Sequence, residues 1–190
     1  KTGFEADDVI GTLAMQAVKE HVNAVIVSGD KDFAQLVRPG VSLYDTMKDV
    51  RTDPDGVKAK YGIRPDQFID YLAMVGDSSD NVPGVRGIGP KGACKLLEEF
   101  ETLDGIYENI DKIKGANQKK LIENKEMAFL SRKLVTIVTD VPLGSSLDDL
   151  RMKPLETEPV RELLKELGFG SFERKIFADS TAAPDNPVTG

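Results

Sequence analysis

Acidic side chains gather in three short clusters of this sequence, and their crowding has a cost. The seven carboxylates are Glu5, Asp7, Asp8, Asp30, Asp32, Asp77 and Asp80. Two like charges about 4 Å apart repel by roughly 1 kcal/mol in bulk water, and by several times that in a shielded site. The clusters therefore either spread over solvated surface or bind hard cations. Because oxygen-only ligand sets suit Mg²⁺ and Mn²⁺, we take metal-assisted phosphate chemistry as the hypothesis.

Each cluster also has an ordinary structural interpretation. Asp7 and Asp8 fall in the first turn of a predicted helix, where the macrodipole favours anions. Asp30 and Asp32 suit a helix N-cap and first turn, and Asp77 suits a polar loop after a helix. What favours a common site is that all three clusters lie at the boundaries of predicted elements.

The elements that position these acids begin as an α/β layer. Apolar residues at helical spacing predict a helix over residues 6–20, and the apolar run Ala24–Val27 predicts a buried parallel strand. A second short helix starts at Phe33, and Val41–Tyr44 is a second strand. Strand, helix, strand implies a right-handed crossover, with ligands at the carboxyl ends of the strands.

Beyond residue 53 the pattern is mostly helical. Helices are predicted over residues 53–61, 65–75, 92–100, 103–107, 119–124, 127–135 and 159–167, while residues 131–138 fit a helix end or a strand. The fold class is thus α/β: a parallel sheet layer followed by a mostly helical region. We expect boundaries at 1–83 for the metal-binding core, 84–177 for the helical region and 178–190 for a flexible linker.

A glycine-rich turn at residues 84–90 carries the second functional signal. Gly87, Gly89 and Gly92 match the dinucleotide pattern G-x-G-x-x-G, but a polar loop precedes them instead of a strand. Two helices joined by a glycine hairpin fit better, and backbone N–H groups there would cradle a phosphate without reading bases. An ordinary tight helix turn is an equally good interpretation of the motif alone. The candidate DNA-binding residues are Arg86, Gly87, Ile88, Gly89, Lys91, Gly92 and Lys95.

Composition narrows the class of protein. The 190 residues carry a net charge of −7, so any nucleic-acid binding has to use a local basic patch. The single cysteine, Cys94, excludes an internal disulfide and fits a reducing cytosol. No apolar run reaches the roughly 18 residues of a membrane span, and no signal peptide is visible. We expect a cytoplasmic protein without a membrane partner.

Three long motifs together resemble a known family. They are residues 3–14 (GFEADDVIGTLA), 27–36 (VSGDKDFAQL) and 76–93 (GDSSDNVPGVRGIGPKGA). In order and spacing they are similar to the 5′→3′ exonuclease domain of bacterial DNA polymerase I, a member of the structure-specific 5′-nuclease (flap endonuclease) family. The resemblance runs from about Gly3 to Phe177.

The resemblance implies that the seven carboxylates bind two divalent cations, Mg²⁺ or Mn²⁺, with Asp30, Asp32 and Asp77 catalytic. It also implies that the hairpin is a helix-hairpin-helix motif for duplex DNA, which often holds K⁺, and that a polymerase region lies downstream. The substrate would be DNA with a 5′ end or flap, in replication and repair, and the protein would be a monomer associated with the nucleoid.

The sequence departs from the family at its start. The family's N-terminal part, with the first strand, two more aspartates and the helical arch, is absent, so we expect weak or no activity from this chain alone. A module that only binds duplex DNA is the main alternative. A related RNA-cleaving nuclease is a third, although it gives no reason for the glycine hairpin.

Overall fold

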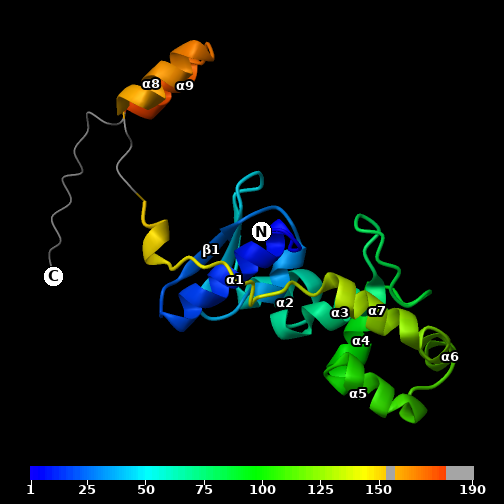
Figure 1. Cartoon of the computed structure of the whole chain (residues 1–190). Helices are drawn as coiled ribbons and strands as arrows, with labels where there is room; N and C mark the ends of the chain where they lie inside the picture. Colours follow the sequence, from blue (N-terminus) through cyan, green and yellow to red (C-terminus); the bar gives the residue numbers. More distant parts are fainter. Residues whose placement is uncertain (153–156, 179–190) are drawn as a thin grey trace, which may run out of the picture. The chain divides into compact units, whose positions relative to one another are not determined.

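The computed structural model of the chain describes residues 1–152 and 157–178. The chain forms two compact units, Lys1–Leu147 and Asp148–Gly190. All seven acids and the glycine hairpin belong to the first unit. The positions of its helices and strands are shown in Figure 1.

The sheet of the first unit has three strands in the order β1-β2-β3, with β1 at Ala24–Val27, β2 at Val41–Asp45 and β3 at Val50–Thr52. β1 and β2 are parallel, with Ile26 opposite Leu43, as the sequence predicts. β3 was not predicted and runs antiparallel to β2, so the sheet is mixed. Its three residues are too few for a periodic signal, and its place comes from pairing with β2 across a turn that contains Asp49 at φ 52°.

The prediction that β1 is buried was wrong for two of its four residues. Val25 and Val27 are 44% and 63% exposed, whereas Ile26 is 6% exposed. β1 lies at the edge of the described sheet, and only the face that carries Ile26 and Leu43 contacts the core. An apolar strand sequence alone does not show which of its faces is covered.

Two helical elements position the acids around this sheet. α1 spans Ala6–Lys19 and contacts β1, burying Ala14 and Met15. The predicted second helix is a 3₁₀ helix, η1, at Asp32–Leu36, which buries Phe33 and Leu36 in the core. β1, η1 and β2 thus form the predicted strand–helix–strand unit.

From Pro54 to Val135 the first unit is helical apart from its connecting loops, and α3–α7 gather beside one another (Figure 1). The elements are α2 at Pro54–Tyr61, η2 at Pro65–Gln67, α3 at Phe68–Val75, α4 at Pro90–Phe100, α5 at Leu103–Glu108, η3 at Ile110–Lys112, α6 at Ala116–Glu123 and α7 at Lys125–Val135. Each corresponds to a predicted helix except η3. α7 ends at Val135 and an extended segment follows, which resolves the ambiguity over residues 131–138.

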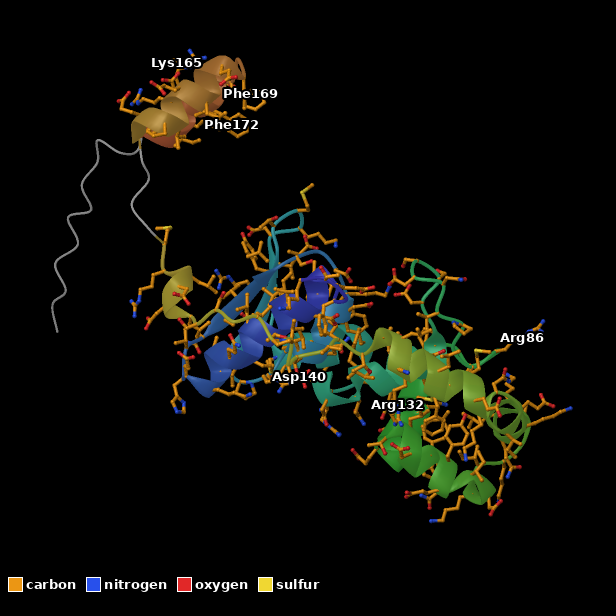
Figure 2. The ribbon with its side chains drawn as sticks, in the orientation of Figure 1. Arg86, Arg132, Asp140, Lys165, Phe169 and Phe172 are labelled. Carbon is orange, nitrogen blue, oxygen red and sulfur yellow. The ribbon has the colours of Figure 1, made fainter. Side chains whose placement is uncertain are left out.

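Arg132 of α7 joins the helical region together (Figure 2). Its guanidinium lies 2.6 Å from Asp104 in the first turn of α5 and 3.8 Å from Asp70 of α3. The second oxygen of Asp70 accepts the backbone N–H of Leu103 at 2.8 Å. Arg132 therefore fixes α7 against α3 and α5, because its fork of donors serves two partners at once.

The second unit contains η4 at Asp148–Leu150, α8 at Thr157–Glu166 and α9 at Gly170–Ala178. Gly168 has φ 70° in the turn between α8 and α9, as a helix-ending glycine should. The rings of Phe169 and Phe172 lie 6.0 Å apart and are both largely exposed (Figure 2). α9 was not predicted. The predicted linker covers residues 178–190. Of these, Ala178 is the last residue of α9, and residues 179–190 lie outside the described residues.

Among the described residues, no helix combines the length and the apolar character needed to cross a membrane.

Candidate metal centre

The acidic side chains converge on one cavity of about 370 Å³. Three acids come from the start of α1, two from the end of β1 and η1, and one from the loop after α3. They are Glu5, Asp7, Asp8, Asp30, Asp32 and Asp80. The rest of the lining comes from Leu134–Ile137 and Val82, which are apolar except for Thr136.

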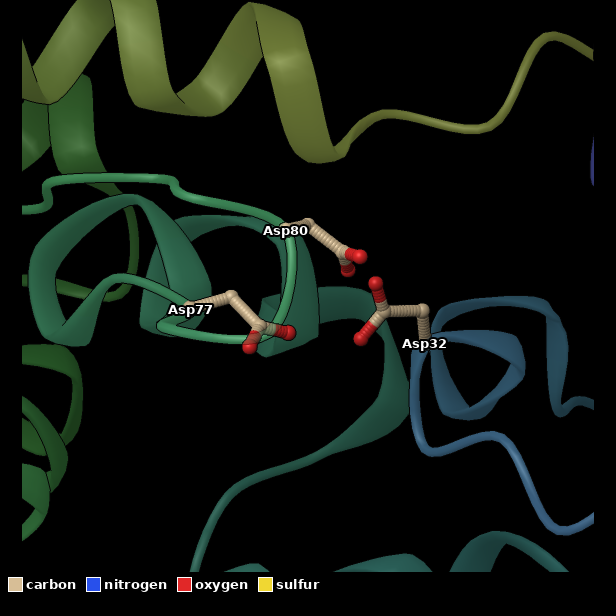
Figure 3. A group of neighbouring side chains, drawn as sticks. All are labelled: Asp32, Asp77 and Asp80. Atoms are coloured by element: carbon tan, nitrogen blue, oxygen red, sulfur yellow. The ribbon is translucent and has the colours of Figure 1, made fainter.

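Asp77 joins this group through its neighbours. One carboxylate oxygen from each of Asp32, Asp77 and Asp80 lies within 4.8 Å of the others (Figure 3). Asp32 comes from η1, whereas Asp77 and Asp80 follow α3, so the tertiary fold brings together residues more than forty positions apart. Figure 3 shows the Asp80 and Asp32 carboxylates directed toward each other.

Local hydrogen bonds fix the acids that follow β1. The Ser28 hydroxyl accepts the N–H of Asp30 at 3.0 Å, and the Asp30 carboxylate accepts the N–H of Asp32 at 2.9 Å. Asp30 therefore initiates η1 and also lines the cavity. The same side chain therefore fits both interpretations: it caps a helix, and it is available as a functional acid of the cavity.

A tight loop presents the third cluster. Asp77 and Val82 exchange two backbone hydrogen bonds, at 2.9 and 2.7 Å, which close residues 77–82 into a loop. Gly76 at φ 77° lets this loop leave α3, and a Cβ there would lie 2.6 Å from the carbonyl oxygen of Val82. Ser79 donates its N–H and its hydroxyl to one oxygen of Asp77, at 2.9 and 2.6 Å.

Lys31 supplies a cation to the cluster. Its Nζ forms an ion pair with the second oxygen of Asp77 at 2.5 Å. Burial would raise the pKa of Asp77, but the contacts from Lys31 and Ser79 hold it below the ordinary value. The same carboxylate raises the pKa of Lys31. Asp77 is thus held ionised.

Two other acids have raised pKa values. Burial, reinforced by Asp30, raises the pKa of Asp32 to about 6, although Lys31 partly opposes this. Burial and the charges of Asp30 and Glu5 raise the pKa of Asp7. Burial disfavours the ionised form of both carboxyls, and the neighbouring negative charges add to this effect.

The donor set fits divalent metal ions. All the ligands are carboxylate oxygens, which hard cations such as Mg²⁺ and Mn²⁺ prefer. Oδ1 of Asp32 is buried, and no described residue donates a hydrogen bond to it. A buried carboxylate oxygen without a donor is costly, and a bound cation would compensate it.

Asp8 differs from its neighbours because backbone groups contact both of its oxygens. Oδ2 accepts the N–H of Glu5 at 3.0 Å, and Oδ1 accepts the N–H of Val138 at 2.8 Å. Asp8 therefore caps α1 and connects it to the segment after α7. Its position on the cavity wall is compatible with a second role in holding a metal.

The sequence interpretation missed the segment Val135–Val141, which forms part of the cavity wall and which we call the strap. Gln35 of η1 donates its amide to the carbonyl of Val135 at 2.9 Å and accepts the N–H of Ile137 at 3.0 Å. The only signal in the sequence was a polar Gln35 between apolar neighbours Ala34 and Leu36, all of which are buried.

The glycine hairpin connects α3 to α4 in the helical region. Arg86 is exposed and extends outward (Figure 2), whereas Ile88 is only 5% exposed, so Ile88 has only its backbone to offer a ligand. No atom lies within 4 Å of the position of a Cβ on Gly89, which leaves its backbone open to approach. Lys120 of α6, not predicted, donates its ammonium to the carbonyl of Gly87 at 2.8 Å.

Two family models cover most of the chain. One, described as the N-terminal resolvase-like domain of 5′-3′ exonuclease, matches residues 1–62, and the other, its C-terminal SAM fold, matches residues 63–158. The chain belongs to the 5′-3′ exonuclease family. The predicted family and fold class are therefore confirmed. The two family models meet at residue 62, and the two compact units divide at residue 147. Neither division tests the predicted domain boundary at residue 83, which stays a prediction.

Curated relatives of this family member are mostly larger. DNA polymerase I of Caldicellulosiruptor bescii is 46% identical over 181 residues, which cover 92% of this chain but 21% of the relative. The flap endonuclease Xni of Shewanella loihica is 45% identical over 149 residues, or 78% of this chain and 58% of the relative. The chain thus spans about a fifth of the length of the polymerase relatives.

Solved structures support the same fold. The 5′-exonuclease of T5 with bound divalent zinc has a TM-score of 0.65 and 26% identity, covering 72% of this chain and 51% of that one. The T5 D15 protein co-crystallised with metal ions has a TM-score of 0.64 and 26% identity, over 72% of this chain and 52% of its own.

Proposed function

We propose that the chain is the 5′→3′ exonuclease and 5′-flap endonuclease part of a DNA polymerase I, and that it hydrolyses DNA phosphodiesters with divalent metal ions. The observation that carries this proposal is the convergence of the acidic side chains on one cavity beside the carboxyl end of β1. Membership of the 5′-3′ exonuclease family supports it.

Asp32, Asp77 and Asp80 form one group of converging carboxylates and would hold one ion. Glu5, Asp7 and Asp30 line the same cavity and would contribute to a second, with Asp8 beside them at the start of α1. Two divalent ions, Mg²⁺ or Mn²⁺, would supply an activated water and would stabilise the leaving oxygen. Lys31 keeps Asp77 ionised and, together with Ser79, fixes the orientation of its carboxylate.

The hairpin would hold duplex DNA through phosphate contacts. Arg86, Lys91 and Lys95 are exposed around it, and the backbone of Gly87, Gly89 and Gly92 forms its turn. Phosphate contacts carry no sequence information, so binding should be nonspecific and should weaken with salt. Ile88 anchors the turn from the core.

The family resemblance implies a K⁺ ion at this hairpin, but the hairpin is less suited to K⁺ than the acidic cavity is to divalent ions. The carbonyl of Gly87 already accepts a hydrogen bond from the ammonium of Lys120. We propose that this ammonium serves in place of K⁺. The downstream polymerase region has its support in the length of the polymerase relatives, and the monomeric state and nucleoid association stay predictions.

A flap-cleavage assay tests the proposed function. The chain, in excess over a duplex with a 5′ flap and supplied with Mn²⁺, should release the flap slowly, and Asp77→Asn should abolish the release. Asp111→Asn, which removes an exposed acid on η3, is the matched control and should cleave normally. Flap release that Asp77→Asn leaves unchanged would refute the proposal that this cavity cleaves DNA, and duplex binding without any cleavage would favour the alternative, a module that only binds DNA.

A further inference from the structure

The strap Val135–Val141 has no regular secondary structure after Val135, yet buried and distant side chains hold it in place. Gln35 binds it at Val135 and Ile137, Asp8 at Val138, and the hydroxyl of Thr12 accepts the N–H of Val141 at 3.1 Å. Four hydrogen bonds from α1 and η1 thus converge on seven residues.

Two of the three side chains that hold the strap are buried. Gln35 is 5% exposed and Thr12 is 2% exposed. A buried amide that pairs with both a carbonyl and an N–H has little freedom, because moving it would leave buried polar groups unpaired. Gly11 brings the strap close to α1, since a Cβ there would lie 2.8 Å from Cγ2 of Ile137.

The strap bears directly on the acids. Val135, Thr136 and Ile137 line the cavity, and the N–H of Val138 orients Asp8. Gln35 lies on η1, the same short helix that carries Asp32. Any displacement of the strap therefore changes both the wall of the cavity and the orientation of an acid at its edge.

We propose that Gln35 is a positioning residue that holds the strap against η1 and α1 and thereby sets the geometry of the acidic cavity for metal binding. This rests on the proposed function of the cavity as a divalent-metal site. Groups that orient ligands without touching the metal change its affinity by roughly 10- to 100-fold when they are lost. Gln35 does not line the acidic cavity, so its effect on a bound ion would be indirect.

Two variants displace the strap by different means. Gln35→Met removes both amide hydrogen bonds and keeps the length of the side chain. Gly11→Ala changes no polar group and favours the helix, but its methyl would force Ile137 away by roughly half an ångström or more, because carbon atoms prefer separations of about 3.5–4.0 Å. The double variant Gly11→Ala/Ile137→Ala removes the clash and should rescue the first.

Two controls match these changes outside the cavity. Gln67 is also 5% exposed and donates its amide to the carbonyls of Leu97 and Glu101, both at 3.0 Å. Gln67→Met should therefore weaken folding in a similar way without touching the strap. Gly170→Ala adds a methyl on α9 where no atom lies within 4 Å.

The experiment measures the affinity of the chain for Mn²⁺ by electron paramagnetic resonance of the free ion, with folding checked by circular dichroism. Gln35→Met and Gly11→Ala should each weaken Mn²⁺ binding about tenfold or more, the double variant should recover most of the loss, and both controls should stay within about twofold of the parent.

The outcomes separate the two proposals. If the parent binds Mn²⁺ and a folded Gly11→Ala chain binds it equally well, the positioning role is wrong and the metal site stands. Gly11→Ala decides this even if Gln35→Met does not fold. If the parent binds no Mn²⁺, the proposed function fails and the inference fails with it. An equal loss in Gln67→Met would show general destabilisation and would also overturn the inference.

Discussion

Replacing Asp32 by asparagine should change the stability of the chain in opposite directions without and with metal. The pKa of Asp32 is raised from 3.8 to about 6, chiefly by burial and by Asp30. Two pK units correspond to about 3 kcal/mol, and solvent screening of this partly exposed group reduces the expected effect to about 1–2 kcal/mol. In EDTA at pH 7.5, Asp32→Asn should therefore be more stable than the parent by that amount.

The pH dependence follows from the direction of the shift. Because the folded pKa is raised, the neutral carboxyl contributes its full stability below about pH 4, and that contribution is lost as the pH rises through about 6. The parent should lose stability relative to Asp32→Asn between pH 4 and 6, and the difference should level off above pH 7.

Saturating Mn²⁺ should reverse the order of stability. A ligand at 100 times its dissociation constant stabilises the folded state by about 2.7 kcal/mol. The parent should gain this stabilisation, whereas Asp32→Asn, which lacks a carboxylate of the three-acid group, should gain little. Asp111→Asn, the exposed control, should behave like the parent in both conditions.

Urea unfolding followed by tyrosine fluorescence measures the free energy of unfolding of the first unit, which contains the acidic cavity. The chain has four tyrosines and no tryptophan, and all four tyrosines lie within Lys1–Leu147. If Asp32→Asn is less stable than the parent in EDTA at pH 7.5, or gains as much stability from Mn²⁺, then the burial of Asp32 and its crowding by Asp30 do not set the energetics of this cavity.

Three further results are expected. Gly89→Val should weaken duplex binding about tenfold, which corresponds to the loss of one hydrogen bond to a charged phosphate. The unfolding midpoint should not change, because no atom lies near the position of the added Cβ. Equal affinities of the variant and the parent in anisotropy titrations at low salt would contradict this. Parent binding to DNA should be the same in K⁺ and Li⁺ salts, whereas Lys120→Met should bind better in K⁺; a parent that requires K⁺ would disprove the role of the ammonium. Ser131→Ala should cost about 1–3 kcal/mol in urea unfolding, because the buried N–H of Gly84 loses its acceptor, and a change under about 0.5 kcal/mol would contradict this.

Much of the site could be read from the sequence because its signals are local. Asp30 and Asp32 follow an apolar strand within a few residues, and Ser28 and Asp30 make the turn through hydrogen bonds two residues apart. The helix spacing that predicts α1 places Asp7 in its first turn. Neighbours within one turn of a helix or one strand end are determined by the order of residue types, so pattern reasoning reaches them.

What the sequence could not give are the pairings between distant segments. Gln35 contacts Val135 across 100 positions, and Asp8 contacts Val138 across 130. The ammonium of Lys120 reaches Gly87 from a helix whose local pattern gives no hint of it. The exposure of Val25 and Val27, and the pairing of β3, also depend on which faces and edges the fold covers.

The sequence by itself thus determined the chemical groups, their local turns and the family. The tertiary structure decided which carboxylates share a cavity and which of them accept hydrogen bonds from the backbone. It also placed the strap in the cavity wall. The physical reason is that hydrogen bonds and burial between segments depend on the whole packing arrangement, whereas propensity and periodicity report only on residues a few positions apart.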